Sequence, residues 1–373
     1  MSDSNEITRL RVAVLYGGRS TEHEVSQQSA AAVVANLDPL KYEVIPISID
    51  KQGNFHRHDL AALRAHNPRV LASESSAAAL TVAARPGPLF LSQGAPAIDV
   101  VFPIMHGPLC EDGSIQGLLE LAAVPYVGAR VLGSAIGMDK DVAKRLVRAE
   151  GIGVAPYLVV HRPHWEREPE RAGAIEQIER ELGYPVFVKP ATLGSSVGVS
   201  RAADRAQLEA AVLEAQRFDD KTLIEQSVDA REIEFAVLAA EDTAAPPDVS
   251  LPGEIVPRDA FYSFDRKYLD AEGAQLHAPA ELSEEQTREG QALARRIFLA
   301  LECEGMARVD MFLDRRRGRF LFNEVNTIPG FTAISMYPKL WEVSGLSYSA
   351  LLDRLVKDAL RRHARRSELQ RER

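Results

Sequence analysis

Two short strands with facing acidic residues constrain the fold of this chain more than any other segment. Apolar and polar side chains alternate along Arg308–Leu313 and again along Phe320–Asn326, a period of two that is typical of strands with one buried face. The polar run between them, Asp314–Arg319, contains a glycine and indicates a turn. The pair is therefore predicted to form a β-hairpin.

The register of this hairpin is expected to bring oxygen ligands together. With the turn centred near Arg317, Asp310 lies opposite Glu324. Asn326 and Arg308 are expected on the same face. Facing carboxylates are unfavourable without a cation between them, and two carboxylates with an amide suit a hard ion such as Mg2+. The alternative is a set of solvated residues on an exposed sheet face.

Aromatic side chains favour a cleft over that exposed surface. By the same alternation, Phe312, Phe320 and Phe322 are expected on the face that carries the acids. A face with both aromatic and acidic residues is typical of the floor of a binding cleft.

The composition indicates which kinds of partner the chain is not expected to bind. Its 373 residues are 46% hydrophobic and 26% charged, enough for two or three domains, with no apolar run near the ~20 residues that span a membrane. The net charge of −9 argues against a nucleic-acid surface. The two cysteines, Cys110 and Cys303, have no metal-site spacing, and the first residues lack the apolar core of a signal peptide. We therefore expect a cytoplasmic protein without a nucleic-acid or membrane partner.

Strands and helices alternate along the first third of the chain. Buried strands are predicted at 11–16 and 98–105, an alternating strand at 42–49, and helices at about 22–37 and 114–123, which implies a parallel sheet that binds ligands at its carboxyl edge. His106 ends the third strand and fits either a ligand site or a structural role. The alanine-rich segment 54–94 is expected to be an added helical or loop segment.

The middle of the chain contains a loop rich in small residues. Lys189 ends an apolar strand, and residues 190–198 supply Gly, Ser and Thr groups that can contact phosphate oxygens. Neither a G-x-x-x-x-G-K-[ST] nor a G-x-G-x-x-G pattern occurs, which argues against a P-loop or dinucleotide site. A flexible turn is the alternative.

The last third adds a sheet and two helices. Strands are expected at 231–240 and 249–255, a surface loop or lid at about 258–279, and a helix begun by a Ser283–Gln286 capping box. A final amphipathic helix is expected from the spacing of five apolar residues, Leu351, Leu352, Leu355, Val356 and Leu360. The fold is thus expected to be α/β (α+β), with a Rossmann-like N-terminal parallel sheet and domains at 1–130, 131–228 and 229–373.

Six segments, in this order, resemble the D-alanine–D-alanine ligases of the ATP-grasp superfamily over nearly the whole chain. They are GGRSTEHEVS (17–26), HGPLCEDGSIQG (106–117), VKPATLGSSVGVS (188–200), FDRKYL (264–269), ARVDMF (307–312) and NEVNTIPGFTAIS (323–335). The resemblance implies the three-domain ATP-grasp architecture and a homodimer. It also implies ATP-dependent joining of two D-alanines through an acyl phosphate, with release of ADP and phosphate, for peptidoglycan precursors.

The resemblance further implies which residues bind ATP and metal. Two Mg2+ ions, for which Mn2+ can substitute, would lie on the acids of the hairpin. The implied set is Lys140, Lys189, Gly194, Ser195, Ser196 and Val197 for the phosphates, Lys267 of the lid for the γ-phosphate, Glu225, Gln226 and Val228 for adenine, Glu232 for ribose, and Asp310, Glu324 and Asn326 for the metal ions.

A second implied set surrounds the amino acids. Glu22 receives the ammonium of the first D-alanine and is positioned by Ser195 and Tyr268. Arg308 stabilises the oxyanion, and tyrosine at 268 goes with an amine rather than a hydroxyl as the second nucleophile. Three further residues complete this set: His106 near the first substrate, and Gly330 and Ser335 at the second.

One position departs from the family. Cys110 stands where a glycine usually precedes Glu-Asp-Gly. If that backbone needs a positive φ, a cysteine is strained there and the loop beside the first-substrate site changes shape.

Two other functions are compatible with the same residues. Another ATP-grasp carboxylate–amine ligase would share the hairpin and the phosphate loop, and Glu22, Tyr268 and Ser335 argue against it. A non-catalytic ATP sensor is the other, and Arg308 argues against it because a sensor needs no oxyanion donor.

The metal assignment makes a direct prediction. Glu324→Gln should lose turnover while the protein stays folded, because it removes one of the two facing carboxylates. Steady-state rates with circular dichroism as the folding control measure this. An unchanged rate would remove the metal assignment.

Overall fold

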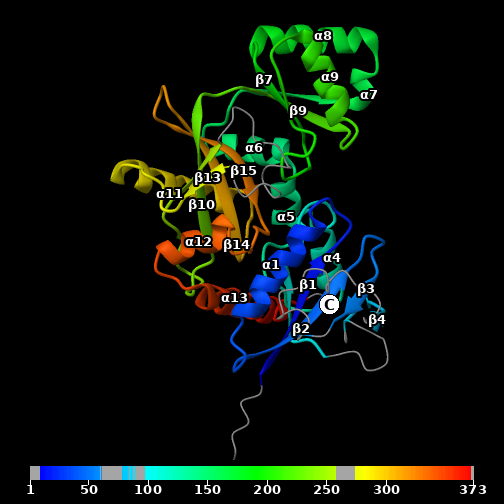
Figure 1. The fold of residues 1–373 in the computed structure, drawn as a ribbon, viewed down its shortest axis with the longest axis vertical. Helices are drawn as coiled ribbons and strands as arrows, with labels where there is room; N and C mark the ends of the chain where they lie inside the picture. Colours follow the sequence, from blue (N-terminus) through cyan, green and yellow to red (C-terminus); the bar gives the residue numbers. More distant parts are fainter. Residues whose placement is uncertain are drawn as a thin grey trace, which may run out of the picture.

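The computed structural model describes residues 9–58, 60, 78–83, 85–86, 89, 97–257 and 274–370. Three sheets follow one another along the chain, and the C-terminal sheet lies between the other two (Figure 1). The mixed α/β fold agrees with the prediction from the sequence. Within the described residues, no helix is long and apolar enough to cross a membrane.

The N-terminal sheet has the order β4-β3-β2-β1-β5. Its centre is parallel, as predicted: β1 (Leu10–Gly17) pairs with both β2 (Tyr42–Ile49) and β5 (Val100–Pro103). The strands of this centre are largely buried because they are apolar on both faces, as parallel strands covered by helices require. Helices α1 (His23–Asn36) and α4 (Ser114–Leu121) follow β1 and β5.

The alanine-rich segment contributes strands to this sheet, contrary to expectation. β3 (Phe55–Arg57) and β4 (Ala78–Leu80) extend it as antiparallel edge strands. Runs of three residues are too short to show a period of two, so the sequence does not predict these strands. Much of the rest of 54–94 lies outside the described residues.

The central sheet has the order β6-β9-β7-β8 and lies farthest from the N-terminal sheet (Figure 1). Its strands pair antiparallel around a core of their own, which includes Trp165, Val188 and Leu208. The elements are β6 (Tyr157–His161), α7 (Arg162–Trp165), α8 (Glu168–Glu181), β7 (Val186–Pro190), β8 (Ser200–Ala202), α9 (Arg205–Ala215) and β9 (Lys221–Gln226).

The C-terminal sheet is antiparallel and has the order β13-β12-β10-β14-β15, with β11 also on β10. Helix α11 (Glu284–Ala300) covers it and begins at the predicted Ser283–Gln286 capping box. The strands are β10 (Ala230–Leu238), β11 (Asp248–Val249), β12 (Gly253–Pro257), β13 (Ala274–His277), β14 (Met306–Asp314) and β15 (Phe320–Asn326).

Two expectations for this sheet need correction. The strand predicted at 249–255 is two short strands, β11 and β12, that both pair with β10. Residues 274–277, predicted as the end of the lid, form β13 and pair with β12. The four residues of β13 are too few for their alternation to indicate a strand. Residues 258–273 of the predicted lid lie outside the described residues.

Two helices precede the central sheet. α5 (Val131–Met138) and α6 (Lys140–Ala149) belong by prediction to the central domain, yet both pack against β15 of the C-terminal sheet. Ala143 and Val147 of α6 share one core with Phe235 and Phe322 of that sheet. The exact domain limits remain a prediction.

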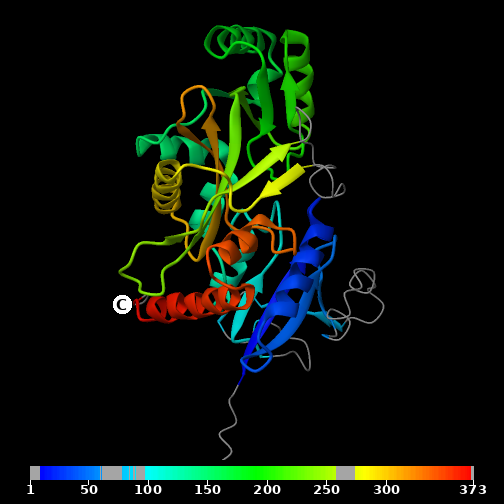
Figure 2. The same cartoon turned by 60° about the vertical axis from the view of Figure 1, so that its left-hand side comes forward.

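The C-terminal helices join the first and last parts of the chain. α12 (Met336–Val343) and α13 (Tyr348–Ser367) contribute to one core with the N-terminal sheet, and α13 runs beneath the C-terminal sheet (Figure 2). Arg362 of α13 is the polar centre of this junction. Its guanidinium contacts Asp358 at 2.7 Å, Glu304 at 3.0 Å and the Gly128 carbonyl at 3.0 Å.

Arg362 is predicted to be the residue on which this junction depends most. Arg362→Leu should lower the free energy of unfolding by about 1–3 kcal/mol, because it leaves one oxygen of buried Asp358 and the Gly128 carbonyl without their donor, while Arg361 still contacts the other Asp358 oxygen. Arg365→Leu, on the exposed side of the same helix, should change it by about 0.5 kcal/mol or less. Urea unfolding followed by circular dichroism measures both. Equal effects would show that the Arg362 network adds no stability of its own.

Candidate functional site

A row of acidic side chains crosses three strands of the C-terminal sheet. Asp310 of β14 pairs with Glu324 of β15, which confirms the predicted register. On its other side Asp310 pairs with Glu234 of β10, a buried acid that the sequence analysis did not include. The sequence contains an indication of this acid, because Glu232 and Glu234 alternate with Ile233 and Phe235, which are buried.

The aromatic residues of β15 do not share this face, contrary to prediction. Met311 pairs with Phe322 rather than with Asn323, so Asn323 is an extra residue between two regular ladders. Phe320 and Phe322 therefore point into the core on the opposite face, together with Met311. A bulge of one residue reverses the faces, and nothing in the alternation reveals it.

Protein cations accompany each carboxylate of the row. Arg308 makes two hydrogen bonds to Asp310, at 2.7 and 2.6 Å, and its Nε lies 3.3 Å from Glu234. Lys140, at the start of α6, lies 3.2 Å from Glu324 and donates to the Leu193 carbonyl at 2.6 Å.

The predicted metal ligands share one face but do not form a closed metal centre. Asp310 and Glu324 are directly opposite each other, and Asn326 pairs with Arg308 two positions away. Among the described residues, no group of three His, Cys, Asp or Glu side chains could by itself hold a metal ion. Two carboxylates and an amide fit the oxygen preference of Mg2+ if further oxygen ligands come from a bound molecule.

A buried carboxylate between two lysines lies near the end of β9, an inner strand of the central sheet. Glu225 of β9 contacts Lys189 of β7 at 2.6 Å and Lys144 of α6 at 2.7 Å. Burial raises the pKa of Glu225, but the two ammonium groups outweigh it and hold that pKa at about 2. The same pairing raises the pKa of Lys189 although burial opposes it.

Lys144 was missed by the sequence analysis, although its position carries a signal. The buried residues of α6 are Lys140, Ala143, Lys144 and Val147, the spacing of an apolar stripe. Two lysines at core-facing positions of a helix are unusual because buried ammonium groups require partners.

The Gly/Ser loop reaches from the central unit to the N-terminal one. The Ser195 hydroxyl donates a short hydrogen bond to the carboxylate of Glu22, which precedes α1 and is 6% exposed. Ser195 and Ser196 both have positive φ angles, 51° and 60°, a conformation that non-glycine residues rarely adopt. The loop therefore holds a strained shape against Glu22.

The His106 side chain connects the N-terminal unit to the turn after β15. Its Nδ1 lies 3.1 Å from the Ile328 carbonyl and its Nε2 lies 3.3 Å from the Ser29 hydroxyl. Burial lowers the pKa of His106, which suits a neutral ring that donates to the carbonyl and accepts from the hydroxyl. In this structure both ring nitrogens serve the fold.

The backbone strain expected at Cys110 falls one residue earlier. Leu109 has a positive φ of 67°, whereas Cys110 is not among the described residues with positive φ. The cysteine is 1% exposed, and a side-chain carbon added at Gly18 would lie 3.1 Å from its Sγ. The departure from the family pattern is therefore accommodated as packing rather than as backbone strain.

The remaining predicted residues lie around these groups. The Ser335 hydroxyl, ahead of α12, accepts from the Thr332 backbone N–H at 2.9 Å and leaves no room for a side chain at Gly330. Gln226 donates its amide to the Leu182 carbonyl at 2.8 Å, and Val228 and Glu232 are half-buried. Lys267 and Tyr268 lie outside the described residues.

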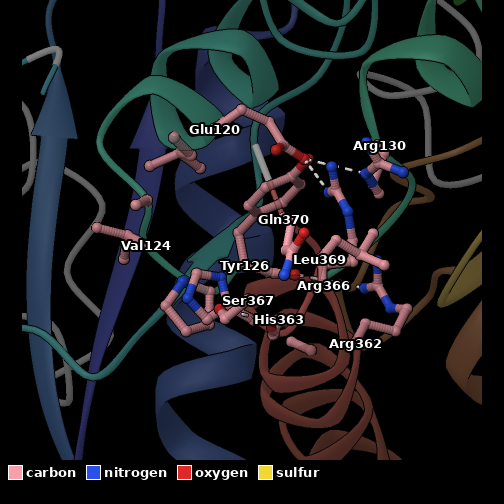
Figure 3. A pocket seen from close by; sticks show the side chains of 14 residues that line it. Glu120, Val124, Tyr126, Arg130, Arg362, His363, Arg366, Ser367, Leu369 and Gln370 are labelled. Atoms are coloured by element: carbon pink, nitrogen blue, oxygen red, sulfur yellow. Dashed lines mark hydrogen bonds and ion pairs between the residues drawn. The ribbon is translucent and has the colours of Figure 1, made fainter. Parts of the chain in front are cut away.

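A cavity of about 600 Å3 lies away from all of these residues, between α4 and α13 (Figure 3). Its charges are already balanced: Glu120 accepts from Arg366 at 2.7 Å, from Arg130 at 3.0 Å and from Tyr126 at 2.9 Å. These bonds outweigh burial and hold the pKa of Glu120 at about 2. The cavity is part of the junction that Arg362 anchors.

Two family models match the sequence. The model described as D-ala D-ala ligase N-terminus matches residues 11–129, and the one described as D-ala D-ala ligase C-terminus matches residues 146–357. The chain is also 50% identical over 372 residues to D-alanine–D-alanine ligase A of Bradyrhizobium diazoefficiens, covering 97% of this chain and 98% of the relative.

Solved structures give the same result. The D-alanine–D-alanine ligase of Coxiella burnetii superposes with a TM-score of 0.84 at 39% identity and covers 96% of each chain. The VanG D-Ala:D-Ser ligase of Enterococcus faecalis superposes with a TM-score of 0.83 at 34% identity, covering 94% of this chain and 100% of that one.

A buried acid behind Glu22 makes the stability of this site depend on pH. Glu111 accepts from the Gly107 backbone N–H at 2.7 Å, and burial, together with the charge of Glu22, raises its pKa from 4.5 to about 8. The folded state thus keeps a proton that the unfolded chain loses near pH 4.5. The resulting stability is complete below that pH and is lost as the pH rises towards 8.

Glu111→Gln removes this titration. We expect the melting temperature of the wild type to fall more between pH 5 and pH 8 than that of the variant. Glu176→Gln, on the exposed side of α8, is the control and should follow the wild type. Scanning calorimetry at both pH values measures this, and identical slopes for all three proteins would contradict it.

Proposed function

Since the chain belongs to the D-alanine–D-alanine ligase family, we infer that it joins two D-alanine molecules in a peptide bond and converts ATP to ADP and phosphate. The family acts in the synthesis of peptidoglycan precursors. The roles of individual residues, the metal ions, a homodimer and a cytoplasmic location are parts of this proposal.

One observation carries the proposal for the site: all three units contribute to one group of contacts. The Ser195–Glu22 hydrogen bond joins the central loop to the N-terminal unit. Lys140 joins the same loop, through the Leu193 carbonyl, to Glu324 of the C-terminal sheet. A reaction between a nucleotide and two amino acids requires such a meeting point, because its rate depends on holding the reactants in position.

ATP is proposed to lie between the central and C-terminal sheets. Lys189 and Lys140 would hold the phosphates under the loop of Gly194, Ser195, Ser196 and Val197. Adenine would lie beside Glu225, Gln226 and Val228, ribose beside Glu232, and Lys267 would reach the γ-phosphate. Asp310, Glu324 and Asn326 would hold two Mg2+ ions, which neutralise phosphate charge when bound.

The first D-alanine is proposed to place its ammonium on Glu22, beside His106. Its carboxylate oxygen attacks the γ-phosphorus of ATP, the bond to ADP breaks, and an acyl phosphate forms. Ser195 keeps the Glu22 carboxylate in position through the hydrogen bond described above.

The second D-alanine is proposed to bind at Gly330 and Ser335, near the start of α12. Its deprotonated amine attacks the acyl carbon, and phosphate leaves. Arg308 would donate to the oxyanion of that step, and its hydrogen bonds from Nε and Nη2 to Asp310 orient the guanidinium. Tyr268 is proposed to favour the amine over a hydroxyl.

Phosphate release tests the function. With ATP, Mg2+ and D-alanine alone we expect phosphate and a dipeptide in equal amounts, and no turnover with L-alanine. Depsipeptide formation from D-alanine and D-lactate would contradict the role given to Tyr268. A product that contains D-serine in preference to D-alanine would place the chain with D-Ala:D-Ser ligases, and no turnover with any D-amino acid would contradict the ligase function.

A further inference from the structure

The buried ammonium of Lys144 belongs to none of the roles above, yet it joins three elements around the proposed nucleotide. It extends from α6, contacts Glu225 of β9 at 2.7 Å and donates to the Phe322 carbonyl of β15 at 3.2 Å. The Phe322 ring lies 5.7 Å from the same ammonium. The central sheet, the C-terminal sheet and α6 therefore share one buried charge.

The two lysines on Glu225 differ in what they can reach. The Lys144 side chain is 0% exposed and that of Lys189 is 12% exposed, and each contacts a different carboxylate oxygen of Glu225. Lys144 cannot contact a nucleotide without a rearrangement of the core. Lys189 ends its strand beside the Gly/Ser loop and can exchange its partner.

We propose that Lys144 is a positioning residue for ATP: it keeps a counter-ion on Glu225, so that Lys189 can leave that carboxylate and bind phosphate. Glu225 is 2% exposed, and a buried carboxylate without a partner is strongly unfavourable. With Lys144 in place, the departure of Lys189 leaves one ion pair on Glu225 rather than none.

The spacing of α6 adds a second link to the same function. Lys140 and Lys144 are four residues apart and lie on one side of the helix. Lys140 contacts Glu324, while Lys144 contacts the carbonyl of Phe322, two residues before it on β15. One helix therefore sets the distance between the carboxylate of the adenine pocket and the carboxylate proposed for the metal.

The inference rests on the proposed position of ATP, and kinetic constants separate the two. Lys144→Met keeps the length of the side chain and removes its charge. It should raise the KM for ATP at least tenfold and leave the KM for D-alanine within twofold. Arg145→Met, at the exposed neighbouring position, should leave both constants unchanged.

A double variant distinguishes charge balance from simple damage to the core. Glu225→Gln together with Lys144→Met removes both buried charges. Its KM for ATP should be closer to that of the wild type than the product of the two single effects predicts. Effects that multiply, or a Lys144→Met variant with an unchanged KM for ATP, would overturn the inference.

Lys189→Met is the reference for the proposed site itself. If its KM for ATP does not rise, the position proposed for ATP is wrong, whatever Lys144 does. If Lys144→Met does not fold, Glu225→Gln is compared with the double variant. The inference then expects less than a threefold difference in the KM for ATP, and a tenfold increase in the double variant would overturn it.

Discussion

The repulsion between carboxylates lined up across neighbouring strands is the constraint on which the rest of the structure depends. Glu234, Asp310 and Glu324 occupy adjacent positions of β10, β14 and β15, where side chains on the same face cannot avoid one another. Arg308 is placed inside the sheet and Lys140 at its edge to balance them. Under the proposed function, metal ions that accompany ATP would take over part of this balance and leave Lys140 available to the phosphates.

Local patterns predicted most of what lies within single elements. The alternation around Asp310 and the turn near Gly318 gave the correct partner for this acid, and the Ser283–Gln286 capping box marked the start of α11. These features succeed because they depend on residues close in sequence. The predicted face of Phe322 was wrong because Asn323 is an extra residue in the strand, and nothing in the residue types around it indicates a bulge.

Such local patterns do not predict contacts between segments that are far apart in the sequence. The periodicity of α13 shows that it has an apolar face, but not that this face packs on a core shared with β1 and β5. Pairing of Lys144 with Glu225 likewise joins residues 81 positions apart, through a helix that packs on a different sheet. The family resemblance predicts the general arrangement of the domains, and only the three-dimensional structure shows the geometry of these pairs.

The bulge at Asn323 has a consequence for how a hairpin of this kind can vary. Because Asn323 is an extra residue, a strand shortened by that residue would keep Phe322 in the core and Glu324 among the acids. What it would lose is the local bend and the added twist that a bulge gives to its strand. The extra residue in β15 therefore sets the angle at which Glu324 and Asn326 project from the sheet. A related chain could change the orientation of Glu324 relative to Asp310 by one insertion or deletion, without replacing any acidic residue.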